Sequence, residues 1–461
     1  MRLGWLCATV LIGMASTSVA WAETVDTFIR GQMSERHITG VALAVIQNGK
    51  TVKLQGYGIA SVEFTVAVTP NSVFEIGSVS KQITAAAILL LVEDGKLRLD
   101  DPISVSIPES PPAWKDVTVR HLLTHTSGIR NYSEVAGFEL SKRMNRQAFV
   151  RELAQYPLDF QPGEKWSYSN SGYNLLGHLI AQASGQTYWD FLKARVFGPL
   201  GMKTAGDRDL NYVIPNRVTG YEWDNDRLTG RDYDLTDLFS AGAIVASITD
   251  LVQWNAALSS VGFLKAESMR ELWKPVTLNN GKTHPYGFGW NIETIRGLRR
   301  LRHNGQTAGF AASIAHYPDQ NLTVIALCNS GESGAAGILT HGVAKQYLSE
   351  LALRKATATA DPDSARTKRL LTVTKALLEQ SLPLSVFAEK ARQALAQDRS
   401  LALFRRLAAY GPIKSFDLIG VDDPPAQVLT YRAALGAHLA AIRFTLTDDG
   451  QIAALSVVEE E

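Results

Sequence analysis

The chain has 461 residues, of which 46% are hydrophobic and 20% are charged; this composition is typical of globular proteins and allows a large domain with a smaller one, or two to three domains. Lysine and arginine (46) nearly balance aspartate and glutamate (45), so the net charge is +1. Because no basic stripe or acidic tail stands out, the sequence argues against nucleic acid or an anionic membrane as the main partner.

The N-terminal segment has the pattern of a secretory signal peptide. Arg2 precedes an apolar run over residues 3–14, and small residues follow. This pattern predicts a signal peptide at residues 1–22, cleaved before Glu23, since the run is too short to span a membrane. Its removal would leave Cys328 as the single cysteine, so no intramolecular disulfide could form. We therefore expect a bacterial periplasmic or secreted protein with no integral membrane span after cleavage.

The next elements predict a mixed fold. Residues 39–60 alternate and turn at Asn48-Gly49, which is typical of a β-hairpin. Residues 84–264 read as mainly helical, and strand patterns return from Tyr286 through residues 301–330. Strands on both sides of a helical insertion predict an α+β domain whose two ends share one sheet.

Residues 74–97 predict a helix that is apolar on nearly every face, as in helices buried between other elements. Gly77 allows a tight turn before it, and Gly95 provides a left-handed end. Ser78 and Lys81 are three apart and share a face. Since a buried lysine is costly, two interpretations stand: a capping serine with a lysine that reaches water, or a nucleophile whose proton passes to a neutral lysine.

Two further motifs follow in the order that serine acyl transfer needs. In KWSYSNSGYN, Tyr168 and Asn170 are separated by one residue, so an extended segment projects both side chains to the same side. In RLRHNGQTAGF, His303 and Gly305 lie in a strand pattern, where the glycine lets a substrate backbone approach closely. Each motif alone is weak, but S-x-x-K, Y-x-N and H-x-G in this order favour catalysis.

The C-terminal part predicts a second unit. Residues 354–366 have the composition of a linker between a domain at 23–353 and a small α+β domain at 367–461. That domain should contain two helical stretches (369–379 and 384–410) and four strands (413–418, 427–432, 438–447 and 452–459). It shows no catalytic cluster, so we expect an accessory role and a possible homo-oligomer through this domain.

With its three motifs, the sequence resembles the serine hydrolases that include class C β-lactamases, D-alanyl-D-alanine carboxypeptidases of the penicillin-recognising fold and related carboxylesterases. The resemblance extends through HLLTHTSGI, VFGPLGM, SAGAIVASITDLVQW and YGFGW, and covers about residues 38–330. It implies a β-lactamase/transpeptidase-like α+β fold, with an antiparallel sheet flanked by helices and a mainly helical subdomain.

The resemblance also implies catalytic roles. Ser78 would attack a carbonyl and become acylated, while Lys81 takes or orients its proton. Tyr168, hydrogen-bonded to Lys81 as a phenolate or as a proton shuttle, would assist the attack and later activate the deacylating water.

The other implied roles concern substrate binding. Asn170 would bind the acyl amide, and His303 and Gly305 would line the strand edge opposite. The backbone N–H groups of Ser78 and Gln306 would form the oxyanion hole, where one donor is typically worth about 3 kcal/mol of barrier.

The substrate is less well defined by the sequence. A lysine in the third motif would suit a substrate carboxylate, whereas His303 can be uncharged near neutral pH. We expect a serine hydrolase acting on an ester or a D-amino-acid amide or peptide. A class C-like β-lactamase and a non-hydrolytic protein that binds a cell-wall peptide or a partner are the alternatives.

We expect no cofactor and no metal. His121 and His125 are four residues apart, as zinc ligands can be, but the chain has no H-E-x-x-H motif. The absence of a G-x-S-x-G elbow disfavours an α/β-hydrolase.

Overall fold

The computed structural model describes residues 15–135, 145–209, 211–260, 262–332, 334–381, 383–395, 398–422 and 427–460. Most of the predicted signal peptide, including its apolar run, lies outside the described residues. Helix α1 (Ala15–Glu35) runs across the predicted cleavage point. Among the helices that the structure describes, none is long and apolar enough to cross a membrane.

The main sheet has seven strands in the order β11-β12-β13-β14-β1-β2-β3. They are β1 (Gly40–Gln47), β2 (Lys50–Ser61), β3 (Val66–Ala67), β11 (Asn291–Ile295), β12 (Leu298–Thr307), β13 (Phe310–Tyr317) and β14 (Leu322–Cys328). β1 and β2 form the predicted hairpin, and Asn48 and Gly49 both have positive φ (50° and 72°), as a type I′ turn requires. β1 also pairs with β14, which confirms that the two ends of the domain share a sheet.

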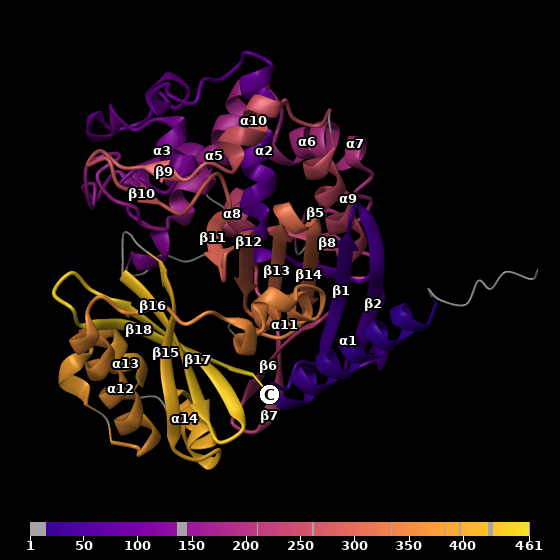
Figure 1. Ribbon diagram of the computed structural model, residues 1–461. Helices are drawn as coiled ribbons and strands as arrows, with labels where there is room; N and C mark the ends of the chain where they lie inside the picture. Colours follow the sequence, from indigo (N-terminus) through magenta and orange to yellow (C-terminus); the bar gives the residue numbers. More distant parts are fainter. Residues whose placement is uncertain are drawn as a thin grey trace, which may run out of the picture.

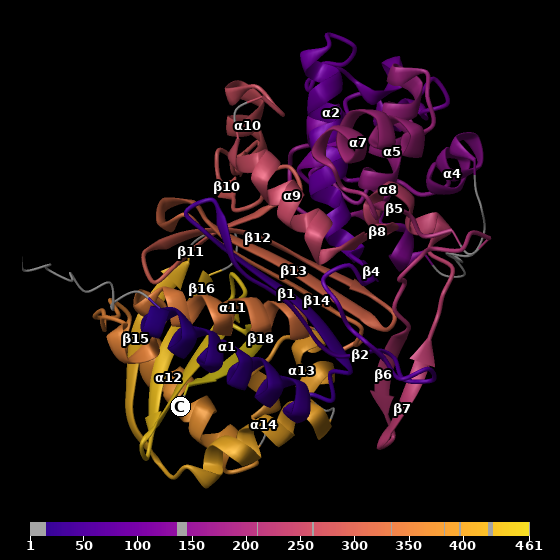
Figure 2. The same ribbon diagram turned by 90° about the vertical axis from the view of Figure 1, so that its right-hand side faces the viewer.

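Both faces of the sheet are buried at its central strands β1, β13 and β14. Along β1, Val41, Leu43 and Val45 pack with residues of α1 and of α11 (Ala335–Tyr347), whereas the alternate residues pack with the helical subdomain. Figures 1 and 2 show α1 and α11 on one side of the sheet, and α2 (Ser80–Glu93) and α9 (Ile248–Ser259) on the other. Burial on both faces explains why β1 is a nearly continuous apolar run.

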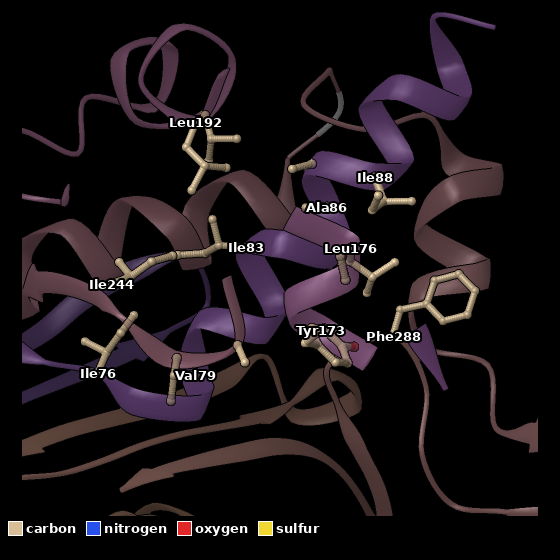
Figure 3. Close-up of a cluster of buried hydrophobic side chains, with 14 of the residues drawn as sticks. Ile76, Val79, Ile83, Ala86, Ile88, Tyr173, Leu176, Leu192, Ile244 and Phe288 are labelled. Carbon is tan, nitrogen blue, oxygen red and sulfur yellow. The ribbon is translucent and has the colours of Figure 1, made fainter. Parts of the chain in front are cut away.

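Helix α2 is the centre of the helical subdomain. All residues from Ser80 to Leu91 are buried, and Figure 3 shows Ile83, Ala86 and Ile88 of α2 within this cluster of apolar side chains. The remaining helices of the subdomain are α3 (Val119–Leu123), α4 (Arg146–Leu153), α5 (Asn170–Ser184), α6 (Tyr188–Leu192), α7 (Gly198–Leu200), α8 (Phe239–Gly242) and α10 (Ala266–Leu272).

The structure also contains short strands that the sequence did not predict, both within the expected helical middle (84–264) and on either side of it, where β4 occupies the start of the helix expected at 74–97. β4 (Val73–Glu75), β8 (Ile244–Ser247) and β5 (Gly206–Asp207) form a small sheet, β6 (Gly220–Asp224) pairs with β7 (Arg227–Arg231), and β9 (Val276–Thr277) pairs with β10 (Thr283–His284). The prediction missed them because strands of two to five residues are too short to display a clear two-residue period.

The C-terminal part forms the separate lobe at the lower left of Figure 1. It contains α12 (Ser364–Leu378), α13 (Glu389–Leu395), α14 (Asp398–Ala409) and the sheet β15 (Ile413–Asp422), β16 (Gln427–Leu435), β17 (His438–Leu446) and β18 (Ile452–Glu460). These elements bury a core of their own, which confirms the small α+β domain.

Two details of this domain differ from the prediction. The helical stretch expected at 384–410 is interrupted, because Phe387 is buried, has an extended backbone and bridges to Ile452 of β18. Helix α12 begins at Ser364, inside the expected linker, since Asp363 caps it by accepting a hydrogen bond from the backbone N–H of Arg366.

Candidate active site

Ser78 lies in a tight turn that enters α2. It belongs to the short helix η1 (Gly77–Val79), in which Gly77 has φ of 51°. A side chain is strained at this φ, so glycine suits the position. Ile76 and Val79, on either side, are fully buried, while Ser78 is partly exposed and lines a cavity. The apolar neighbours therefore hold the turn and leave the hydroxyl accessible.

Lys81 is fully buried and has three oxygen partners. Its Nζ lies 3.0 Å from the Oγ of Ser78, 2.8 Å from the Oδ1 of Asn170 and 2.7 Å from the carbonyl oxygen of Ala241. Burial lowers the pKa of Lys81 well below its ordinary value, because the interior disfavours the charged ammonium. Burial thus shifts Lys81 towards its neutral amine form.

The three partners of Lys81 are not equivalent. The amide oxygen of Asn170 and the carbonyl oxygen of Ala241 can only accept hydrogen bonds, so they take both N–H groups of a neutral amine. The remaining lone pair of Nζ then faces Ser78, whose hydroxyl can donate to it. This arrangement can draw the proton from the Ser78 hydroxyl without any movement of the lysine.

Tyr168 and Asn170 reach Ser78 and Lys81 from the start of α5. Ser169 between them has an extended backbone and caps the helix by accepting from the N–H of Gly172. The Lys81 Nζ lies over the Tyr168 ring, 4.8 Å from its centroid, and its hydrogen bonds go to Ser78, Asn170 and Ala241, so the predicted hydrogen bond between Lys81 and Tyr168 is wrong. The Tyr168 hydroxyl bonds instead to Ser78. Burial raises the pKa of Tyr168, partly offset by its hydrogen bond with Ser78, so this side chain is a neutral phenol.

Strand β12 touches the turn that carries Ser78. A Cβ atom added to Gly305 would lie 1.9 Å from the carbonyl oxygen of Ile76, and one added to Gly77 would lie 2.7 Å from the backbone nitrogen of Gln306. Both close contacts therefore require a residue without a Cβ atom at positions 77 and 305. They bring the backbone of Gln306 next to that of Ser78, where two N–H groups can converge on an oxyanion.

A buried ion pair supports the same contact. The Arg208 Nε donates to Glu75 Oε1 over 2.9 Å, and the Thr307 hydroxyl at the end of β12 donates to Glu75 Oε2 over 2.7 Å. Glu75 lies three residues before Ser78, so these bonds tie the strand before the turn to the strand that lines the cavity.

His303 is buried and uncharged. Its Nε2 lies 3.0 Å from the Tyr286 hydroxyl and its Nδ1 lies 2.7 Å from the carbonyl oxygen of Asn304. Burial lowers the pKa of His303 to about 3. This side chain therefore offers no positive charge to a substrate carboxylate near neutral pH.

The cavity at Ser78 has a volume of about 360 Å³. Its lining residues include Ser78, Tyr168, His303, Gly305 and Gln306, so the structure brings residues of all three motifs to one space. Among the lining residues that the structure describes, none carries a carboxylate.

The two histidines weighed as zinc ligands have structural partners. His121 Nδ1 accepts from the backbone N–H of Thr118 in the cap of α3, and His125 Nδ1 accepts from the backbone N–H of Ser169. Within the described ranges, no group of three or more potential ligands could hold a metal ion.

The sequence interpretation missed three partners of the site: Ala241, His125 as a neighbour of Tyr168, and Tyr286. The His125 and Tyr168 ring centroids are 4.4 Å apart. Ala241 acts through its backbone and carries no side-chain signal. His125 and Tyr286 do lie in segments that carry the resemblance, HLLTHTSGI and YGFGW, and those segments could have directed attention to them.

A family model described as Beta-lactamase matches residues 25–348. This chain belongs to that family. Penicillin-binding protein 4* of Bacillus subtilis (strain 168) is 32% identical over 320 residues, which cover 65% of this chain and 70% of that protein. A D-aminopeptidase of Brucella anthropi is 30% identical over 322 residues, which cover 68% of this chain and 61% of that protein. As a member of the beta-lactamase family, the chain is a serine hydrolase.

A solved structure extends the likeness to nearly the whole chain. The octameric penicillin-binding protein homologue from Pyrococcus abyssi has a TM-score of 0.63 at 22% identity and covers 95% of both chains. The fold predicted from the sequence, a penicillin-recognising α+β domain followed by a small α+β domain, is confirmed for this family member.

Proposed function

We propose that this family member is an exported hydrolase, periplasmic or secreted, that forms an acyl-enzyme on Ser78. Lys81 accepts the proton that the Ser78 hydroxyl loses and returns it to the leaving group. Tyr168, a neutral phenol in contact with Ser78, passes protons rather than acting as a phenolate, and assists the attack of water on the acyl-enzyme. This proposal rests on the hydrogen bonds of Lys81. They occupy both N–H groups of the neutral amine, so its lone pair faces the Ser78 hydroxyl.

Other groups around Ser78 hold the substrate in this proposal. The backbone N–H groups of Ser78 and Gln306 stabilise the oxyanion. The side-chain nitrogen of Asn170 binds the acyl amide, since its Oδ1 already accepts from Lys81, and Gly305 lets the substrate lie close to β12.

We propose an ester or a D-amino-acid amide or peptide as the substrate. The uncharged His303 favours acyl groups without a carboxylate at that position, which weighs against a dedicated β-lactamase. The family relationship to a D-aminopeptidase supports an amide of a D-amino acid.

One preparation tests both the location and the chemistry. We expect full-length protein expressed in a bacterium to be recovered from the periplasm or medium, with an intact mass that begins at Glu23. That protein should hydrolyse p-nitrophenyl butyrate and D-alanine amides faster than benzylpenicillin. A cytoplasmic chain that begins at Met1 would refute the location. Failure to hydrolyse either substrate class would refute the enzyme function, and preferential turnover of benzylpenicillin would favour the β-lactamase alternative.

We further propose that the domain at residues 367–461, joined by the linker at 354–366 to the hydrolase domain at 23–353, holds a homo-oligomer together. The Pyrococcus abyssi protein is described as octameric, and the likeness to it includes this domain. The full chain should be oligomeric by light scattering. A chain ending at Ala360 should be monomeric and keep its ester turnover, because the residues lining the cavity lie outside the domain. An unchanged oligomeric state would remove this proposal.

A further inference from the structure

A continuous chain of hydrogen bonds runs behind the candidate site. It starts at the backbone N–H of Ser169, 3.1 Å from His125 Nδ1, and continues from His125 Nε2 to the Tyr286 hydroxyl over 3.2 Å. From Tyr286 it passes to His303 Nε2 over 3.0 Å, and it ends between His303 Nδ1 and the carbonyl oxygen of Asn304, 2.7 Å apart. The chain connects the Y-x-N loop with the H-x-G strand.

The two ends of this chain determine the position of every proton in it. A backbone N–H only donates, so His125 Nδ1 is an acceptor and the neutral ring carries its proton on Nε2. A carbonyl oxygen only accepts, so the neutral His303 ring carries its proton on Nδ1. Tyr286 accepts from His125 and donates to His303. With both rings neutral, no other arrangement gives a partner to all four ring nitrogens.

The surroundings keep both rings neutral. Burial lowers the pKa of His303 to about 3 and that of His125 well below its ordinary value. Arg302, on the neighbouring position of β12, also disfavours a charge on His303. The other titratable groups near the two rings are the phenols of Tyr168, Tyr173 and Tyr286 and the imidazole of His284, none of which supplies a negative charge near neutral pH.

The position of the chain connects it to the reacting groups. The His125 ring packs against the Tyr168 ring, and Ser169 lies between Tyr168 and Asn170, the partner of Lys81. At the other end, His303 lies two residues before Gly305, which touches the turn of Ser78. Through its two hydrogen bonds, Tyr286 thus connects the loop that carries Tyr168 and Asn170 with strand β12, along which the substrate is proposed to bind.

The geometry points to Tyr286 and His125 as positioning residues of this enzyme. They hold the Y-x-N loop against the H-x-G strand and fix His303 as an Nδ1-protonated neutral imidazole whose two nitrogens are both bound within the protein. His303 then presents no N–H group to the acyl cavity, so this ring supplies no hydrogen-bond donor to a substrate carboxylate. This inference rests on the proposed hydrolysis at Ser78.

The first test measures the tautomers and does not depend on turnover. The protein contains nine histidines, and nitrogen-15 labelling with His125→Gln and His303→Gln variants would assign the two rings. We expect His125 protonated on Nε2 and His303 on Nδ1, unchanged from about pH 5 to about pH 8. Either ring in the opposite tautomer, or titrating to the cation in this range, would overturn the proposal even if Ser78 is acylated normally.

The second test uses Tyr286→Phe, which removes the hydroxyl and keeps the ring. We expect the two histidine signatures to change and kcat for p-nitrophenyl butyrate to fall about 10- to 100-fold, with a smaller change in KM. Tyr57→Phe is the matched control, because Tyr57 is a buried phenol on the far face of the sheet that bonds Asp26. A Tyr286→Phe variant with wild-type kcat and wild-type tautomers would overturn the proposal. If the wild type itself does not hydrolyse p-nitrophenyl butyrate, the proposed hydrolase function is refuted instead.

Discussion

Ser78→Ala abolishes covalent labelling of the protein by a fluorophosphonate and lowers kcat/KM for ester hydrolysis at least about 10⁴-fold. The hydroxyl of Ser78 is the only group of that turn placed both at the cavity and against Lys81, and alanine supplies no oxygen to form the acyl-enzyme. Intact mass spectrometry after incubation with the reagent measures the effect: one adduct on the wild type and none on the variant.

Ser80→Ala provides the matched control for this result. Ser80 lies two residues away, is fully buried, and accepts a hydrogen bond from the backbone N–H of Ile244. The Ser80→Ala variant should therefore be labelled by the fluorophosphonate to the same extent as the wild type. An adduct that persists on folded Ser78→Ala would place the nucleophile elsewhere, and the same experiment with benzylpenicillin separates an ester-like cavity from a β-lactam-like one.

Lys81→Met slows acylation of Ser78 about 10²- to 10⁴-fold, because methionine fills a similar volume but cannot accept a proton. Time-resolved adduct formation measures this rate directly. In the wild type the rate should rise with pH through the depressed pKa of Lys81, since only the neutral amine accepts the proton. The variant should lose this dependence. Acylation at the wild-type rate would show that Lys81 is not the base.

Lys81→Arg distinguishes a base from a positive charge. Arginine keeps the charge at all accessible pH values and cannot be deprotonated in a protein. If Lys81 acts as a base, the arginine variant should be as slow as the methionine variant. Recovery of the rate with arginine would instead assign Lys81 an electrostatic role.

Local sequence patterns predicted much of the fold. The turn residues Asn48 and Gly49 determine a hairpin because few other pairs adopt positive φ at both positions. The apolar residues on every face of α2 indicate a helix enclosed by other elements, as observed. The short strands β4, β5 and β8 could not be predicted, because their pairing depends on partners that are distant along the chain, such as Val73 with Ser247 and Gly206 with Val245.

The sequence predicted only part of the candidate site. Residue types and spacing singled out Ser78 with Lys81, Tyr168 with Asn170, and His303 with Gly305, because a nucleophile and its helpers need particular functional groups. The spacing could not show that Asn170 would bond Lys81 across 89 positions, or that His125 would support Tyr168 and not a metal. Such contacts depend on how α2, α5 and β12 pack together.

The sequence by itself therefore determined the hairpin, the buried helix, the two-part organisation and the three motifs, since each depends on a local backbone preference or on the chemistry of a side chain. Only the tertiary structure decided the protonation of the site. It buried Lys81 with two groups that can only accept, and it linked His125, Tyr286 and His303 between a backbone donor and a backbone acceptor. Burial and long-range hydrogen bonds set pKa values and tautomers, and neither is encoded in the spacing of residues along the chain.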